Sequence, residues 1–137
     1  MRKIKFRGKR INGGEWVYGS LLQDTGLGKA REDTLICAES TAFSVIPETV
    51  GQFTSLIDKN GKEIYEGDVV RFIDYTYTPL DGLKHEGYIA YNKGYFEIVV
   101  GDNLRYCLHS LQLWVYNHCE VIGNIHDNPD LLTDGRD

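Results

Sequence analysis

The sequence contains no hydrophobic run of the roughly 20 residues that a membrane-spanning helix needs. Its N-terminus also lacks the apolar core of a signal peptide. We therefore expect a soluble, cytoplasmic protein. Cysteine is scarce, with three copies and no Cys-x-x-Cys pair, whereas disulfide frameworks use even and dense sets. We expect Cys37, Cys107 and Cys119 to be reduced, buried thiols.

Proline and methionine are rare, with three and one copies, whereas the chain has 15 glycines and nine tyrosines. Such a composition, with many β-branched and aromatic residues punctuated by glycine, favours strands and tight turns over helices. With 42% hydrophobic residues among 137, the chain can bury a core, which argues against general disorder. The length fits one domain or two small ones in close contact.

Positive charge is in deficit, because 15 Lys and Arg face 20 Asp and Glu. Residues 1–57 have a net charge of +2 and residues 58–137 a net charge of −7. Wholesale nucleic-acid binding is disfavoured, since phosphate contacts need a positive face. The first ten residues are the exception, with six possible phosphate contacts and no acid: Arg2, Lys3, Lys5, Arg7, Lys9 and Arg10. The simpler interpretation is the solvated face of a strand, with Ile4 and Phe6 on the other face.

Turn signals divide the N-terminal part of the chain into short strands. Alternating residues around Asn12-Gly13-Gly14 predict a hairpin. Residues 24–33 are polar and glycine-rich and predict a loop, and residues 34–40 predict a strand. Pro47 marks a sheet edge or a break, because proline cannot donate to a strand ladder.

Strand follows strand from residue 62 onward. A loop is predicted at residues 75–86, and a hairpin at residues 87–100 around Asn92-Lys93-Gly94. Residues 104–113 fit either a helix or a strand, because leucines recur there at helical spacing. Short strands separated by turns predict an all-β barrel or sandwich.

The acids in residues 58–72, "DKNGKEIYEGDVVRF", suggest either a metal site or turns. An EF-hand loop has glycine at position 6, but Gly61 falls at position 4 when counted from Asp58. The nearby lysines add charge that repels a cation. The stretch is therefore not an EF-hand.

Turn chemistry explains the same stretch better. Asn60-Gly61 supplies the positive φ angles of a tight hairpin. Gly67-Asp68 predicts a second turn that opens a strand, where Asp68 accepts backbone N–H bonds. We predict structural turns at Asn60, Gly61, Gly67 and Asp68 rather than a metal site.

The cysteines and histidines do not form a zinc pattern. Zinc needs four converging ligands. In strands, Cys107 and His109 share a face, but His118 and Cys119 point to opposite faces. A Cys-His nucleophile pair is not marked by any activating neighbour. No Walker loop, dinucleotide fingerprint or nucleophile elbow is present in the sequence, so we expect no cofactor, no metal and no catalytic residues.

Aromatic residues could form a stacking platform for single-stranded nucleic acid. The candidates are Tyr75, Tyr77, Tyr88, Tyr91, Tyr95 and Phe96. Acidic residues lie between them in the sequence, so the positive charge that such a platform needs for the phosphate backbone is missing. Core packing and cross-strand pairing are the favoured interpretation.

Four blocks together resemble one family. They are "KIKFRGKR" near the N-terminus, "WVYGSL" at 16–21, "PETVGQFTSLIDKNGKEIYEGDVV" at 47–70 and "EVIGNIHDNPDLL" at 120–132. In this order, and over nearly the whole chain, they resemble the YopX proteins of bacteriophages and prophages. The resemblance implies an all-β fold with an SH3-like barrel or roll, homo-oligomers and no established activity. It implies no catalytic residues.

We therefore expect an all-β protein with little helix: an N-terminal β-hairpin unit over residues 1–57, an SH3-like barrel over 58–126 and an acidic tail over 127–137. The alternative division is one YopX-like domain over 1–132. The expected function is that of a non-enzymatic phage or prophage accessory protein in the bacterial cytoplasm. It would act through self-association and contacts with host or phage proteins, away from membranes. A nucleic-acid-binding module using the basic N-terminal segment is the alternative.

Overall fold

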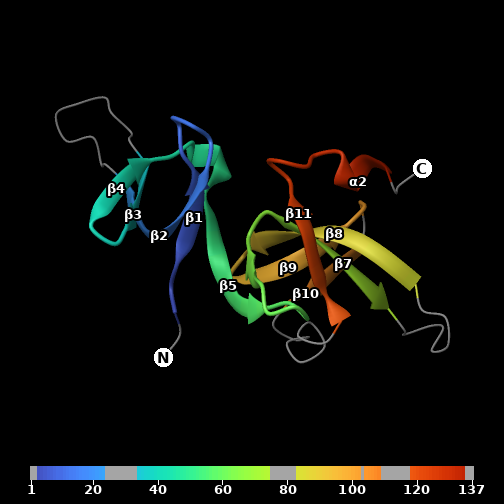
Figure 1. Ribbon diagram of the computed structural model, residues 1–137. Coiled ribbons are helices and arrows are strands. Elements are labelled where there is room, and N and C mark those ends of the chain that lie inside the picture. Colours follow the sequence, from blue (N-terminus) through green and yellow to red (C-terminus); the bar gives the residue numbers. More distant parts are fainter. Residues whose placement is uncertain (1–2, 24–33, 75–82, 103, 109–117, 135–137) are drawn as a thin grey trace. The chain divides into compact units, whose positions relative to one another are not determined.

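The computed structural model describes residues 3–23, 34–74, 83–102, 104–108 and 118–134. Regular structure is almost entirely β-strand, in antiparallel sheets (Figure 1), which confirms the all-β prediction. Among the described residues, helix comprises the 3-10 turn η1 (Pro47–Thr49), the short α2 (Leu131–Asp134) and the single residue His118. The chain divides into two compact units, Met1–Phe53 and Thr54–Asp137.

The N-terminal unit is built on a run of antiparallel neighbours. They are β1 (Phe6–Lys9), β2 (Trp16–Gln23), β3 (Thr34–Ala38) and β4 (Thr41–Ser44), and the first residues of β5 (Gly51–Ile57) pair with the other side of β1. The predicted hairpin joins β1 to β2, with Lys9 opposite Trp16 and positive φ angles at Gly13 and Gly14. The predicted loop at 24–33 lies outside the described residues.

The core of this unit lies on one face of its strands. Ile36 on β3 and Val45 just after β4 are almost fully buried. Gly8 on β1 leaves room for Val45, because a Cβ at Gly8 would lie 3.0 Å from the Val45 Cβ. Pro47 begins η1 directly after this point, so the strand ends where the missing N–H predicts a break.

The C-terminal unit contains the end of β5, the short β6 (Glu63–Tyr65) and a five-stranded antiparallel sheet in the order β10-β9-β8-β7-β11. These strands are β7 (Asp68–Asp74), β8 (Leu83–Asn92), β9 (Tyr95–Val100), β10 (Leu104–Cys107) and β11 (Glu120–Asn124). The first four form a meander, and β11 returns to the free side of β7 (Figure 1). SH3-like closure of this sheet stays a prediction.

The structure describes two of the predicted segments, residues 104–113 and 75–86, only in part. The segment 104–113 is a strand at Leu104–Cys107, whereas residues 109–113 lie outside the described part. The predicted loop at 75–86 is described only from Leu83, which already belongs to β8.

At the start of the acidic tail, the backbone N–H groups of His126 and Asp127 donate to the Asn124 side chain, and α2 follows.

The core of the C-terminal unit draws on most of its strands. Its buried members are Leu56, Ile64, Val70, Phe72, Ile89, Phe96, Ile98, Leu108 and Cys119. The Phe72 and Tyr106 rings meet edge to face with centroids 5.3 Å apart. Strands β7, β8 and β9 therefore contribute Val70, Phe72, Ile89, Phe96 and Ile98 to this core.

Candidate functional site

The Asp58 carboxylate connects the turn between β5 and β6 to strand β11. Among the described residues, no cluster of three or more His, Cys, Asp or Glu side chains could hold a metal ion. Asp58 is 1% exposed, and its Oδ1 accepts the N–H groups of Asn60 at 2.8 Å and Lys62 at 2.9 Å. Its Oδ2 accepts the Val121 N–H at 2.9 Å. The structure places Asn60 and Gly61 in the turn between β5 and β6, with φ of +82° at Gly61.

Sequence reasoning named the turn but missed Asp58 as its anchor. The available signal was an Asp two residues before Asn-Gly, since such an Asp accepts the backbone N–H two residues on. The bond to Val121 had no local signal at all.

The second predicted turn lies between β6 and β7. Gly67 has φ of +94°, its N–H donates to Ile89 O at 2.8 Å, and its carbonyl accepts the Ile125 N–H at 2.9 Å. Asp68 is buried at the first position of β7, where its Oδ2 accepts the Tyr65 N–H at 2.8 Å. Both residues therefore connect chain segments that are distant in the sequence or lie on either side of the turn.

The basic N-terminal segment differs from the solvated face that the alternation predicts. Arg7 is only 5% exposed, whereas Ile4 is 60% exposed. The Arg7 guanidinium lies 4.6 Å from the centre of the Trp16 ring, and Lys9 Nζ lies 5.9 Å from it. Stacking on an indole lets a weakly hydrated guanidinium leave water, which period-2 alternation does not anticipate.

The six predicted phosphate contacts are not gathered in one place. Lys5 lies over the Phe53 ring. Arg10 lies over the Phe43 ring and pairs with Glu15 at 2.9 Å. Lys3 is exposed, and Arg2 lies outside the described residues.

The thiols are unequal. Cys119 is fully buried, whereas Cys37 and Cys107 are half-buried. Desolvation, and secondarily the nearby charge of Asp58, raises the pKa of Cys119 to about 12. This thiol is a poor nucleophile and a poor metal ligand at neutral pH. His109, the predicted strand neighbour of Cys107, lies outside the described residues.

The aromatic residues on the β8–β9 hairpin are only partly in the core. Phe96 is buried and meets Tyr91 edge to face at 5.2 Å, as cross-strand pairing predicts. Tyr91 is nevertheless 54% exposed, and Tyr95 is also exposed. Tyr88 is half-buried, and Tyr75 and Tyr77 lie outside the described residues. The core interpretation is therefore wrong for Tyr91 and Tyr95.

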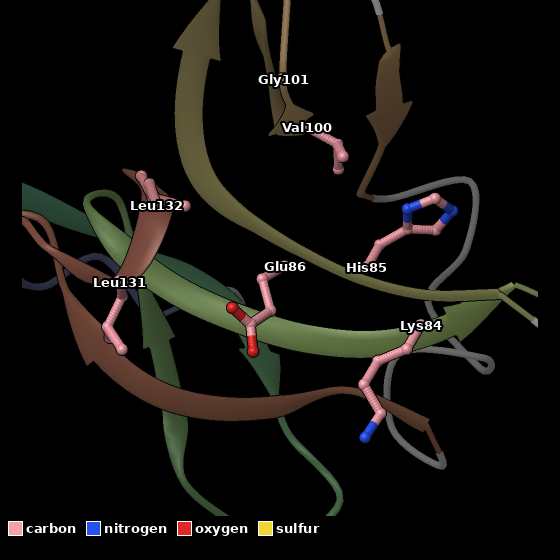
Figure 2. Close-up of a pocket in the computed structure, with 7 residues that line it drawn as sticks. All are labelled: Lys84, His85, Glu86, Val100, Gly101, Leu131 and Leu132. Carbon is pink, nitrogen blue, oxygen red and sulfur yellow. The ribbon is translucent and has the colours of Figure 1, made fainter. Parts of the chain in front are cut away.

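A cavity of about 320 Å³ lies beside β8, between the end of β9 and α2. Its lining consists of Lys84, His85, Glu86, Val100, Gly101, Leu131 and Leu132. Lys84 and Glu86 project from one side of β8 and His85 from the other (Figure 2).

Two polar side chains of this cavity, His85 and Glu86, are engaged in packing and pairing. The His85 ring packs against Phe72, with centroids 5.4 Å apart. The Glu86 carboxylate pairs with Arg71 at 2.8 Å. These interactions position both side chains as parts of the sheet.

The N-terminal unit presents an uncharged surface, which we call the β2–β4 face. Direct cross-strand partners lie on the same face, and positions two apart on a strand share it. By the observed register, the β2–β4 face consists of Tyr18, Ser20, Leu22, Leu35, Cys37, Ala42 and Ser44. Five of these residues are exposed, and Leu22 reaches 51% exposure.

No helix in the described part of the chain is long and apolar enough to cross a membrane. The two antiparallel sheets define a small all-β protein. The family model described as "YopX protein" matches residues 5–133. The chain therefore belongs to the YopX family, as the four sequence blocks indicated.

Comparison with solved structures agrees on the fold. "Crystal structure of protein EF1440 from Enterococcus faecalis" is similar over 96% of this chain and 99% of that chain, with a TM-score of 0.59 and 24% identity. At this identity the likeness concerns the fold alone. No curated protein is significantly similar to the chain.

Proposed function

We propose that this protein is a non-enzymatic accessory protein of phage or prophage origin that acts in the bacterial cytoplasm through self-association and contacts with host or phage proteins. The observation that carries the proposal is the β2–β4 face. Over three strands it is mostly exposed and carries no charged residue, and on β1 it is bordered by Arg7 and Lys9, the direct partners of Tyr18 and Trp16. The family membership supports the phage origin.

The composition of this face favours a protein partner. The chain has 26% charged residues, but none of the seven positions of the β2–β4 face carries a charge. Interface cores are depleted in charge and enriched in tyrosine. Tyr18 and Leu22 lie on the same face of β2, separated on that face by Ser20. Burying a leucine fully contributes about 1.5–3 kcal/mol. In a two-fold symmetric dimer each residue enters the interface twice, so the gain is doubled.

Light scattering coupled to size-exclusion chromatography tests the self-association. We expect the wild-type protein to elute with a mass well above the 15.6 kDa of one chain. Leu22→Glu should return it to a monomer, because each copy would bring a carboxylate into an apolar contact.

The matched control is Leu104→Glu. The exposed fraction of Leu104, 46%, is similar to the 51% of Leu22, but Leu104 belongs to β10 of the other unit. A wild-type monomer at micromolar concentration would contradict the proposal, as would equal disruption by both variants.

A second candidate is nucleic-acid binding by the N-terminal segment. It is supported by Arg7 and Lys9, which occupy alternate positions of β1 and both lie over the Trp16 ring, and by Lys5 just before the strand. Fluorescence anisotropy with duplex and single-stranded oligonucleotides at low salt should then show binding that weakens steeply with added salt. The double variant Lys5→Gln/Lys9→Gln should bind less. Absence of binding by the wild-type chain at low salt would remove this candidate.

A further inference from the structure

A second cavity, of about 250 Å³, lies within the C-terminal unit and has a positively charged lining. Among the described residues, its polar lining consists of Lys59, Arg71, Lys84, His118 and Glu120, and Phe72 and Ile73 also line it. In the described lining, three cationic side chains and an imidazole accompany one carboxylate, and a second carboxylate, Glu86, pairs with Arg71 beside them, although residues 58–137 carry a net charge of −7. We propose that this cavity binds a phosphate group, carried by a small phosphorylated molecule or by a nucleic-acid backbone.

The sheet register explains how three of these charges share a surface. Arg71 on β7 is the direct partner of Glu120 on β11, and Ile73 is the direct partner of Lys84 on β8. Because positions 71 and 73 alternate onto the same face, Arg71, Glu120 and Lys84 all project from that face. Figure 2 shows Lys84 extending away from the side of β8 that carries His85.

Hydrogen bonds at and beside Asp58 bring the other two lining residues, Lys59 and His118, to the same cavity. The Lys59 N–H donates to Cys119 O at 2.9 Å, next to His118. The bond from Val121 N–H to Asp58 fixes the same turn to β11. Lys59 and His118, which are far apart in the sequence, therefore line one cavity.

The existing ion pairs leave cationic capacity for a ligand. Arg71 directs Nε and one terminal nitrogen at a single oxygen of Glu86, at 2.9 and 2.8 Å. A guanidinium has five N–H donors, so others remain. Lys59 and Glu120 are 3.9 Å apart and both partly exposed, which makes that pair weak. Among the described residues, no carboxylate pairs with Lys84.

Phosphate suits this arrangement in charge and in size. Its oxygens accept several charge-assisted hydrogen bonds at once, and an Arg fork with a nearby Lys is a common way to bind them. The cavity is smaller than the roughly 300–1,000 Å³ of pockets that hold drug-sized ligands. It therefore accommodates one or two phosphate groups, while the rest of a larger ligand lies outside.

Calorimetric titration of the full chain with sodium pyrophosphate at low ionic strength tests the site. We expect binding by the wild type and about a tenfold weaker affinity for Lys84→Gln, because one charge-assisted bond is lost. Glu120→Gln should act in the opposite direction and tighten binding by roughly three- to fivefold, because it removes the carboxylate from the lining.

Lys93→Gln is the charge-matched control. Lys93 follows the end of β8, nine positions from Lys84 and so about 30 Å along the strand direction. Its affinity should equal that of the wild type, and circular dichroism should be the same for all variants. No binding at millimolar pyrophosphate, or equal affinity of wild type, Lys84→Gln and Glu120→Gln, would overturn the proposal.

A parallel titration with a single-stranded DNA oligonucleotide distinguishes the two sources of phosphate. Oligonucleotide binding that weakens in Lys84→Gln and tightens in Glu120→Gln assigns the site to a nucleic-acid backbone. Pyrophosphate binding with that pattern, without oligonucleotide binding, assigns it to a small phosphorylated molecule. Either result is independent of self-association, because the β2–β4 face lies in the other unit.

Discussion

At the scale of single residues, two buried carboxylates connect the turns of the C-terminal unit to its strands. Asp58 accepts three backbone N–H groups, and Asp68 accepts one from Tyr65. A buried carboxylate is costly unless its oxygens are hydrogen-bonded. Here the donors are backbone groups that would otherwise lack partners in the turns, so each bond satisfies both sides.

Asp58→Asn should destabilise the protein by about 2–4 kcal/mol. The amide keeps one oxygen, but its NH₂ group replaces an acceptor and meets a backbone N–H donor. Urea unfolding followed by circular dichroism measures the change. Asp102→Asn, in an exposed turn, is the control and should stay within 0.5 kcal/mol of wild type. Equal stability of the two variants would show that Asp58 does not anchor the turn.

Cys119 gives a pH dependence on the alkaline side. Its pKa is raised from 9.0 to about 12 in the folded protein, so folding favours the neutral thiol. This contribution is complete below about pH 9 and is lost as the pH rises toward 12. Between pH 9 and 10.5 the loss approaches about 2 kcal/mol, at 1.36 kcal/mol per pH unit.

Cys119→Ala should remove this part of the pH dependence, although the cavity that it leaves lowers stability at every pH. Urea unfolding at pH 8, 9.5 and 10.5 compares the slopes of the two proteins. Lysine and tyrosine titration affects both equally. Parallel slopes would contradict the raised pKa of the thiol.

At the scale of elements, the β8–β9 pair depends on close approach at one glycine. A Cβ at Gly87 would lie 2.5 Å from Val99 O and 2.9 Å from the Ile98 Cγ2. Gly87 is also the direct partner of Val70, in the middle of the core strand β7. Both neighbouring strands limit any shift, so the backbone has little freedom to move away.

Gly87→Ala should therefore cost about 1–3 kcal/mol, as overpacked sites do. Hydrogen exchange should show faster exchange of amides in β8 and β9, and urea unfolding should give a lower midpoint. Lys84→Ala on the same strand is the exposed control and should leave both measurements nearly unchanged. If the free energy of unfolding of Gly87→Ala equalled that of the wild type, the strands would be able to move apart at no free-energy cost, which would contradict the prediction.

At the scale of the whole molecule, the two units differ in how much core they contain. Within the described part of the chain, nine buried residues form the core cluster of the C-terminal unit. The N-terminal unit is a chain of 53 residues centred on Ile36 and Val45. Chains of this size bury a smaller share of their surface and are marginal by themselves.

We expect a fragment of residues 54–137 to fold independently and a fragment of residues 1–53 to be unfolded alone. Amide dispersion in NMR spectra and cooperativity of urea unfolding distinguish the two outcomes. A dispersed spectrum for the short fragment, or a collapsed one for the long fragment, would contradict the expectation.

The prediction from sequence was most accurate where the cause is local. Strand alternation and the Asn12-Gly13-Gly14 turn act over a few residues, so the hairpin and the all-β class were predictable. The prediction was wrong where burial depends on a partner from another strand. Arg7 leaves water because Trp16 lies across the hairpin, and Tyr91 stays exposed although its cross-strand partner Phe96 is buried.

The sequence by itself determined the all-β class and the YopX family, because side-chain periodicity, turn chemistry and motif order are all carried by neighbouring residues. Only the tertiary structure decided that β11 pairs with β7, that Asp58 accepts the Val121 N–H, and that Lys59, Arg71, Lys84 and His118 line one cavity. Such pairings between distant segments are selected by how the whole chain buries its apolar surface and satisfies its backbone. No local pattern in the acidic C-terminal part of the sequence marks a cationic cavity.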